Sequence, residues 1–264
     1  MQLPLVIGGG VGPMAGVALH ARIIQHTRTD GTDQSHLEVL HFSCSNRVLD
    51  RTEYLLGKVK ENPAWGMVQI FEAAWEAVKV LGYEGIGAIG GIPCNTFHAP
   101  SIFSLFQGEI YKRGIRIRVL HLLEETVRFI AENYPEQKNI GVLSTSGTRK
   151  TALYRQLLES NGYRIVEVPE EEQDAIQQAI YHPEWGIKAK SPVTPKAREE
   201  VVRAIHRVKE RGAEAVILGC TELPLAVPET ILEDVPILDP MVALARAMIR
   251  EAAADKLLQP LPSL

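Results

Sequence analysis

The sequence predicts an α/β protein with two pseudo-symmetric domains, each a parallel sheet flanked by helices. Apolar runs of strand length alternate with longer segments of helical period, and one strand-to-cysteine segment occurs twice. The runs are apolar throughout rather than at every second residue, which is typical of parallel strands covered on both faces. The predicted strands are Leu3–Ile7, Leu37–Phe42, Ile86–Ile89, Ile115–Leu120, Ile140–Leu143, Arg164–Val168 and Ala215–Leu218.

The predicted helices lie between these strands. Their apolar residues recur three and four positions apart, which places those residues on one helical face. The helices are Met14–His26, Met67–Leu81, Glu124–Asn133, Lys150–Ser160, Lys196–Arg211 and Pro240–Ala254.

Two segments are similar enough to indicate an internal repeat. Gly85–Thr96 and Ala213–Glu222 each contain an apolar run, then a cysteine and a hydroxyl residue, and a similar turn precedes both. We therefore expect a first domain from residues 1–117 plus 239–264, which carries Cys94, and a second from residues 118–238, which carries Cys220. Because open α/β sheets bind ligands at the carboxyl ends of their strands, both thiols are expected to point into an active-site cleft between the domains.

Composition narrows the class of partner. The 264 residues are 45% hydrophobic and carry 28 basic and 32 acidic side chains, with no block of like charge that would follow a nucleic acid or a membrane surface. No run reaches the roughly 18 apolar residues of a membrane span, and the first residues lack the pattern of a signal peptide. We expect a cytoplasmic protein with a small-molecule partner, whose three widely spaced cysteines remain thiols.

Cys94 and Cys220 carry the predicted chemistry. A cysteine between a strand and a helix meets free backbone N–H groups, which stabilise a thiolate. With one cysteine on each side of a carbon, a thiolate can remove a proton while a thiol delivers another to the opposite face, and neither a metal nor an organic cofactor is needed. A single free cysteine is more often a small buried hydrophobe, but the matching contexts favour catalysis for this pair. Cys44 has no such counterpart, so we leave it out of the mechanism.

Two other cysteine chemistries are weaker interpretations. Cys94 and His98 have the spacing of metal ligands, but the remaining histidines are scattered singly along the chain. Cys220 with a distant histidine and aspartate could form a hydrolase triad, but this would leave Cys94 without a role.

Two loops are candidates for binding a carboxylate. Gly8–Gly16 follows a strand and opens a helix, but it lacks a full dinucleotide or phosphate fingerprint, so we interpret it as a tight loop whose amides approach a carboxylate or as a structural turn. Ser45–Thr52 contains two arginines, the side chains that bind carboxylates bidentately, although surface arginines are usually solvated. By composition alone Lys188 is ordinary, and Thr148 is most simply a helix N-cap.

The chain resembles the aspartate/glutamate racemase family, and within it the aspartate racemase branch. The resemblance extends over nearly the whole chain, because its motifs occur in the family's order and approximate spacing. These motifs are Gly9–Ala15, Asp33–His36, Asp50–Thr52 with Leu56–Lys58, Pro93–His98, Gly186–Ala189 and Leu218–Leu223.

The resemblance implies a racemase that uses no pyridoxal phosphate and commonly forms a homodimer. It implies that Cys94 and Cys220 are the catalytic pair and that Arg51 and Lys188 engage the side-chain carboxylate of an acidic amino acid. It also implies hydrogen bonds to the α-carboxylate and the sulfurs from Asn95, Thr96 and Thr221. The full set of expected substrate-binding residues is Met14, Asp50, Arg51, Thr52, Asn95, Thr96, Phe97, Thr148, Lys188 and Thr221.

The chain departs from the family pattern at several positions, so more than one substrate is considered. Phe97 stands where alanine is usual and is expected to reshape the pocket, Arg47 and Leu49 replace two prolines, and Gly16 replaces a common threonine. The leading hypothesis is racemisation of aspartate. The alternatives are a glutamate or broad-specificity amino-acid racemase, isomerisation of a dicarboxylate, and a sensor of acidic amino acids without turnover.

Overall fold

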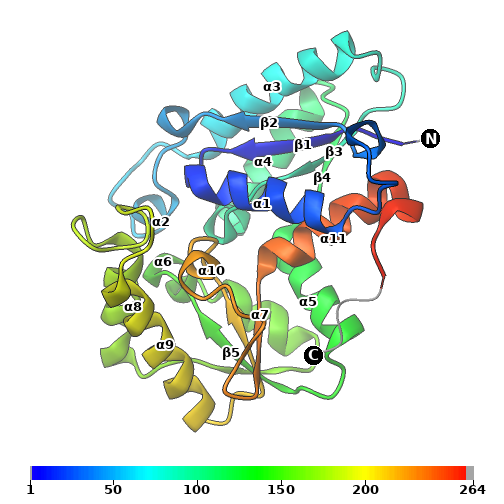
Figure 1. The fold of residues 1–264 in the computed structure, drawn as a ribbon. Helices are drawn as coiled ribbons and strands as arrows, with labels where there is room; N and C mark the ends of the chain where they lie inside the picture. The colour runs from blue at the N-terminus through cyan, green and yellow to red at the C-terminus, as the bar shows by residue number, and fades with distance from the viewer. Residues whose placement is uncertain (1, 260–264) are drawn as a thin grey trace. The chain divides into compact units, whose positions relative to one another are not determined.

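A computed structural model describes residues 2–259, which divide into two compact units (Figure 1). The first unit combines the chain up to Glu125 with a C-terminal segment that starts at Met241, and the second unit is Thr126–Pro240. The boundaries expected from the sequence were 117/118 and 238/239, and the expected domain ends at residue 1 and residues 260–264 lie outside the described residues. No helix within residues 2–259 is both long and apolar enough to cross a membrane.

The first unit contains a four-stranded sheet of order β2-β1-β3-β4 in which every pair is parallel. Its strands are β1 (Leu5–Gly9), β2 (Val39–Ser43), β3 (Ala88–Gly91) and β4 (Ile117–Val119). Its α-helices are α1 (Pro13–His26), α2 (Arg51–Leu55), α3 (Ala64–Val80), α4 (Pro100–Lys112) and α11 (Pro240–Ala253), with 3-10 helices η1 (Asp33–Ser35), η2 (Ser45–Arg47), η3 (Asn95–His98) and η5 (Ala254–Lys256). Helix α5 (Leu122–Asn133) contains the boundary between the units.

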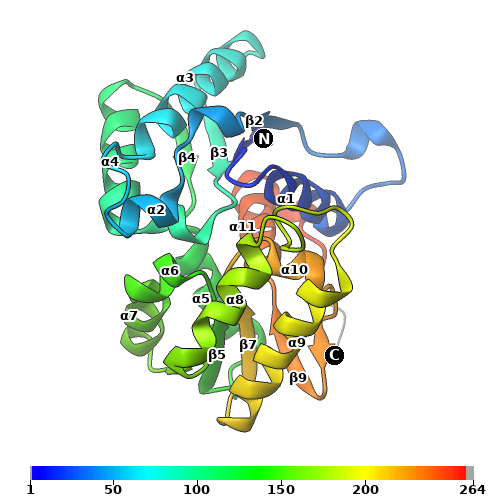
Figure 2. The same cartoon turned by 90° about the vertical axis from the view of Figure 1, so that its left-hand side faces the viewer.

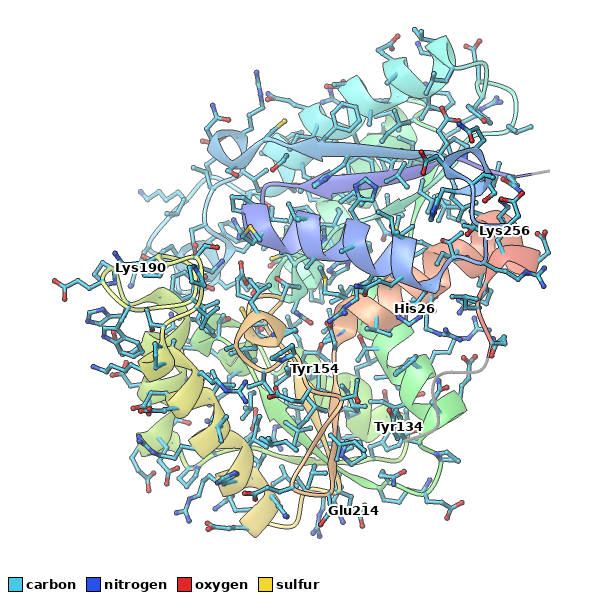
Figure 3. All side chains as sticks on the ribbon, in the orientation of Figure 1. His26, Tyr134, Tyr154, Lys190, Glu214 and Lys256 are labelled. Atoms are coloured by element: carbon cyan, nitrogen blue, oxygen red, sulfur yellow. The ribbon has the colours of Figure 1, made fainter. Side chains whose placement is uncertain are left out.

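Glycines in β3 allow helices to pack closely on both faces of this sheet. A Cβ at Gly90 would lie 3.1 Å from Phe71 of α3, and a Cβ at Gly91 would lie 2.5 Å from Met248 of α11. Arg246 of α11 also approaches His26 at the end of α1, with Nη1 3.3 Å from Nδ1 (Figure 3). The C-terminal helix therefore belongs to the core of the first unit.

The second unit repeats this topology. Its sheet has the order β6-β5-β7-β9-β8, and only the short β8 is antiparallel. Figure 2 shows α8 and α9 over one face of this sheet, where a Cβ at Gly141 of β5 would meet Val208 of α9 at 3.1 Å. The strands are β5 (Asn139–Leu143), β6 (Arg164–Val166), β7 (Ala215–Leu218), β8 (Ile231–Leu232) and β9 (Val235–Leu238), and the helices are α6 (Ser146–Lys150), α7 (Leu153–Ser160), η4 (Glu170–Glu172), α8 (Gln173–Tyr181), α9 (Pro195–Glu210) and α10 (Leu223–Ala226).

The predicted fold class is confirmed, since both units are parallel-dominated sheets flanked by helices. The four parallel strands of the second sheet, β6-β5-β7-β9, correspond in order to β2-β1-β3-β4, and the cysteine segment follows the corresponding strand of each, β3 or β7. The internal repeat read from the sequence thus corresponds to a repeated topology.

Candidate active site

In the first unit, Cys94 lies in a turn just beyond the end of β3. It is 6% exposed, and its carbonyl oxygen accepts a hydrogen bond from the Phe97 N–H at 3.2 Å. Asn95 and Thr96 begin the 3-10 turn η3 and are buried. The turn therefore holds the thiol and two polar side chains together at the carboxyl edge of the sheet.

His98 fixes this turn from its other end, a role that the sequence did not predict. Its Nδ1 lies 2.9 Å from the Cys94 carbonyl oxygen. Burial, reinforced by the neighbouring His121, lowers the pKa of His98 to about 3, so the ring is neutral and Nδ1 can donate to that carbonyl. The spacing of Cys94 and His98 reflects this contact with the backbone, and residues 2–259 contain no group of three His, Cys, Asp or Glu side chains that could hold a metal.

The segment Ser45–Thr52, here called the arginine loop, is anchored by contacts with backbone atoms. The Asp50 side chain accepts from the Glu53 N–H at 2.8 Å and caps the N-terminus of α2. The buried Arg51 that follows donates to the carbonyls of Leu49 at 3.1 Å and Val11 at 3.0 Å. The Arg51 guanidinium therefore joins the arginine loop to the segment Gly8–Gly16 after β1, here called the glycine loop. The neighbouring Thr52 is also buried.

The glycine loop approaches the arginine loop closely. A Cβ at Gly10, which has a φ of +88°, would lie 2.6 Å from the backbone nitrogens of Cys44 and Ser45. Only glycine fits this conformation and this contact. Met14, in the first turn of α1, is 43% exposed.

Phe97 packs in the core of the first unit. It is fully buried, and its ring lies edge-on to Phe106 with 5.5 Å between centroids. The expectation that this ring reshapes a substrate pocket stays a prediction.

In the second unit, Cys220 lies two residues after β7 and contacts Glu222. Its Sγ is 3.1 Å from Glu222 Oε2, the oxygen that also accepts from Thr221 Oγ1 at 3.2 Å. The other oxygen, Oε1, is 2.7 Å from Lys188 Nζ. The structure thus brings three predicted site residues, Cys220, Thr221 and Lys188, together around a carboxylate that the sequence analysis did not single out.

The environment of Cys220 differs from the expectation of a stabilised thiolate. Burial and the Glu222 carboxylate raise the pKa of the Cys220 thiol well above its usual value, although Lys188 opposes them. The expected helix dipole is weak here because α10 is only four residues long. The backbone N–H of Glu222 lowers the pKa of Cys220, as expected for a cysteine that precedes a helix, but burial and the Glu222 carboxylate outweigh this effect.

The loop after β5 lies beside the Cys220 segment. A Cβ at Gly219 would be 3.3 Å from the Ser144 side chain and 3.0 Å from the ring of Tyr154, which is labelled in Figure 3. Thr148 is buried within α6, so it is not the N-cap that its composition suggests. Thr145 is the N-cap of α6, because its Oγ1 accepts from the Thr148 N–H at 3.2 Å.

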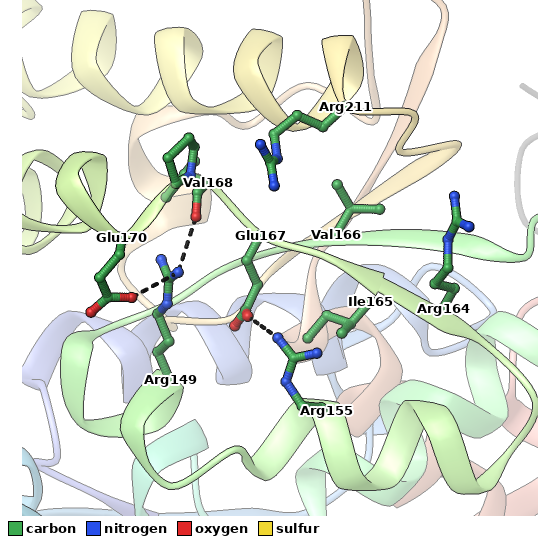
Figure 4. Close-up of a pocket in the computed structure, with 10 residues that line it drawn as sticks. Arg149, Arg155, Arg164, Ile165, Val166, Glu167, Val168, Glu170 and Arg211 are labelled. Atoms are coloured by element: carbon green, nitrogen blue, oxygen red, sulfur yellow. Dashed lines mark hydrogen bonds and ion pairs between the residues drawn. The ribbon is translucent and has the colours of Figure 1, made fainter.

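A cavity of about 590 Å³ elsewhere on the second unit contains none of the predicted site residues (Figure 4). It follows strand β6, and two of its four arginines are used in internal contacts. Arg155 pairs with Glu167, and Arg149 donates to the Val168 carbonyl at 3.0 Å and pairs with Glu170. This cavity is therefore not a candidate for the chemistry of the cysteines.

Two α/β units that each present a cysteine beyond the corresponding strand define a two-domain racemase-like architecture. The chain belongs to the Asp/Glu/hydantoin racemase family, whose model matches residues 9–248. This membership confirms the family resemblance seen in the sequence motifs.

The structure is similar to that of aspartate racemase from Picrophilus torridus, with 26% identity, a TM-score of 0.73 and coverage of 98% of this chain and 96% of that chain. A glutamate racemase from Francisella tularensis in complex with D-glutamate shares the fold at 18% identity, with a TM-score of 0.58 and coverage of 99% of this chain and 85% of that chain. By sequence, the chain is 28% identical over 158 residues to the broad specificity amino-acid racemase RacX of Bacillus subtilis, covering 60% of this chain and 62% of RacX. The match therefore spans less than two thirds of that relative.

Proposed function

We propose that this protein is a cofactor-independent racemase that interconverts L- and D-aspartate, with Cys94 and Cys220 acting on opposite faces of the substrate α-carbon. The observation that carries the proposal is the position of the two cysteines within a chain of this family. Each follows the corresponding strand of its unit, and each is 6% exposed beside polar side chains.

The proposed reaction moves two protons. A thiolate takes the α-proton, so that a C–H bond breaks and an S–H bond forms, and the other thiol gives its proton to the opposite face of the carbon. Negative charge develops on the substrate next to its carboxylate. Asn95, Thr96 and Thr221 would donate hydrogen bonds to this charge, and the substrate ammonium stays protonated to stabilise it further.

Arg51 and Lys188 are proposed to bind the side-chain carboxylate of the substrate. Arg51 suits this role because two backbone carbonyls hold its guanidinium in one orientation. The P. torridus aspartate racemase, which covers nearly the whole chain, favours aspartate as the substrate.

A broader specificity is the second candidate, and the ion pair between Lys188 and Glu222 favours it. Because Glu222 Oε1 lies 2.7 Å from Lys188 Nζ, the charge of this lysine is balanced before any substrate binds. A side-chain carboxylate is then not needed to neutralise Lys188, so uncharged amino acids are candidate substrates as well. RacX, whose name states a broad specificity, is consistent with this alternative.

The test is to incubate the protein in deuterated water with a panel of L- and D-amino acids, without added cofactor, and to record exchange and inversion at the α-carbon by NMR and chiral chromatography. We expect aspartate to invert, Cys94→Ala and Cys220→Ala to abolish inversion, and the control Cys44→Ala to retain it. Wild-type inversion in either of the first two variants, or an absolute need for pyridoxal phosphate, would overturn the proposal. Binding of acidic amino acids without exchange would favour a sensor.

A further inference from the structure

Glu222 connects Cys220 with Lys188, which lies 34 residues before Glu222 in the sequence. One of its oxygens contacts the Cys220 sulfur at 3.1 Å and the other contacts the Lys188 ammonium at 2.7 Å. Its residue is 4% exposed, so these contacts form away from bulk water. Electrostatic effects are stronger in such surroundings than at the surface.

The two oxygens of Glu222 contact different partners. A carboxylate that served only to neutralise Lys188 would need one oxygen for the ammonium. Here the second oxygen faces the S–H of Cys220 and the hydroxyl of Thr221, so it is an acceptor for two donors at the proposed reaction centre.

We propose that Glu222 is a positioning residue that keeps the proton on Cys220 in the free enzyme, so that Cys220 starts as the acid. This inference rests on the proposed function. An anionic oxygen within hydrogen-bond distance of a thiol opposes loss of the thiol proton in two ways, by accepting the S–H hydrogen bond and by repelling the thiolate that would form.

The other groups that face Cys220 do not reverse this effect. Lys188 favours the thiolate, but its ammonium binds the far oxygen of Glu222, and its side chain is 23% exposed. Tyr154 on α7 is neutral, because burial raises its pKa above the usual value. The backbone N–H of Glu222 also favours the thiolate. The raised pKa of Cys220 agrees with burial and the Glu222 carboxylate outweighing Lys188 and this N–H.

Replacement of Glu222 by glutamine should therefore release the thiol proton more easily. The substitution removes the negative charge and leaves Lys188 as the charged neighbour, and both changes favour the thiolate. Glu222→Asp keeps the charge but has a shorter side chain, which should retract the carboxylate from the sulfur and give a smaller change in the same direction.

The experiment uses the full chain with Cys44→Ala and Cys94→Ala, which leaves Cys220 as the single thiol of the protein. The rate of alkylation by iodoacetamide is measured against pH without any ligand. We expect Glu222→Gln to move the midpoint of this profile down by about one pH unit or more, which corresponds to about tenfold faster alkylation near neutral pH. The midpoint for Glu222→Asp should lie between those of the parent and of Glu222→Gln. The midpoint for Glu210→Gln, a surface change next to Arg207, should equal that of the parent.

An unchanged or slower alkylation in both Glu222 variants, with thermal melting showing that each is folded, would overturn the inference. If Glu222→Gln fails to fold, the profile of Glu222→Asp decides alone. Because alkylation requires no turnover, this result is separate from the racemisation assay. A shifted profile in a protein that racemises nothing would contradict the proposed function and leave the control of Cys220 by Glu222 intact.

Discussion

At the scale of single residues, Arg51 is held by contacts that its charge alone does not explain. Two of its N–H groups donate to the carbonyls of Leu49 and Val11, which lie in different loops. Lysine keeps the charge but lacks the planar fork that reaches both carbonyls. The Arg51 guanidinium therefore holds the arginine loop in place and also carries the positive charge that is proposed to bind the substrate carboxylate.

We predict that Arg51→Lys weakens substrate binding and stability together. Loss of hydrogen bonds to a buried charged group should lower the free energy of unfolding by about 1–3 kcal/mol, and KM for aspartate should rise more than kcat falls. Thermal melting and steady-state kinetics measure the two effects. The control is Arg47→Lys, on an exposed side chain 3.4 Å from Gln69. Equal effects from both substitutions would show that Arg51 acts only as a surface cation.

The sequence could identify Cys94 and Cys220 because each is repeated in a matching context, whereas Glu222 could not be assigned its role. Its partner Lys188 lies 34 residues away, and no spacing rule connects them. His98 was visible only as a spacing from Cys94, which fits a metal ligand as well as a backbone hydrogen bond. Partners of this kind become visible only when distant segments are folded together.

At the scale of elements, helix α1 and strand β2 meet at Gly16, a position where the resemblance implies a departure from the family pattern. A Cβ at Gly16 would lie only 2.4 Å from His41 Nε2. The same nitrogen would be 2.7 Å from a Cβ at Gly9. The histidine of β2 therefore fills the space that a side chain at position 16 would occupy.

We predict that Gly16→Ala destabilises the protein by about 1 kcal/mol or more through this clash, although alanine is the better helix former. Chemical denaturation should show that His41→Ala removes the penalty in the double variant. Gly108→Ala is the control, since α4 leaves open space at that position, and it should stabilise by up to about 1 kcal/mol. A Gly16→Ala variant as stable as Gly108→Ala would show that His41 simply moves aside.

Some element boundaries agree with the prediction from the hydrophobic pattern. Others differ, because a backbone conformation or a proline acts against that pattern. The predicted strand Ala215–Leu218 is observed without change. The predicted helix Lys150–Ser160 is broken, because Ala152 adopts a left-handed φ of +52° between α6 and α7. Strand β9 was missed because it contains Pro236, a residue that argues against a strand inside a sheet.

At the scale of the whole molecule, the parallel strands have the same order in both sheets, so the repeat in sequence predicts the fold class well. What the sequence could not supply is the protonation behaviour of the buried groups, which depends on the folded core. Burial lowers the pKa of His26 to about 4 and that of His98 to about 3, from an ordinary value near 6.5.

The low pKa values of His26 and His98 predict that the protein loses stability in acid. Between pH 6.5 and about 3 these histidines bind protons in the unfolded chain but not in the folded chain. Their contribution to the free energy of unfolding is therefore fully present above pH 6.5 and is lost as the pH decreases. Each such histidine contributes a slope of at most about 1.4 kcal/mol per pH unit. Denaturation at a series of pH values should show a shallower slope for His98→Gln than for the wild type. An equal slope in the two proteins would contradict the assignment of a neutral His98.

The most direct test of the two-cysteine account is the position of solvent deuterium early in the reaction. L-aspartate is incubated in deuterated water with the wild-type protein, and both enantiomers are isolated at low conversion and analysed by mass spectrometry. Two bases on opposite faces predict deuterium at the α-carbon of the D-product and almost none in the recovered L-substrate. Deuterium appearing as fast in the recovered substrate, or a product that keeps its original proton, would contradict the account.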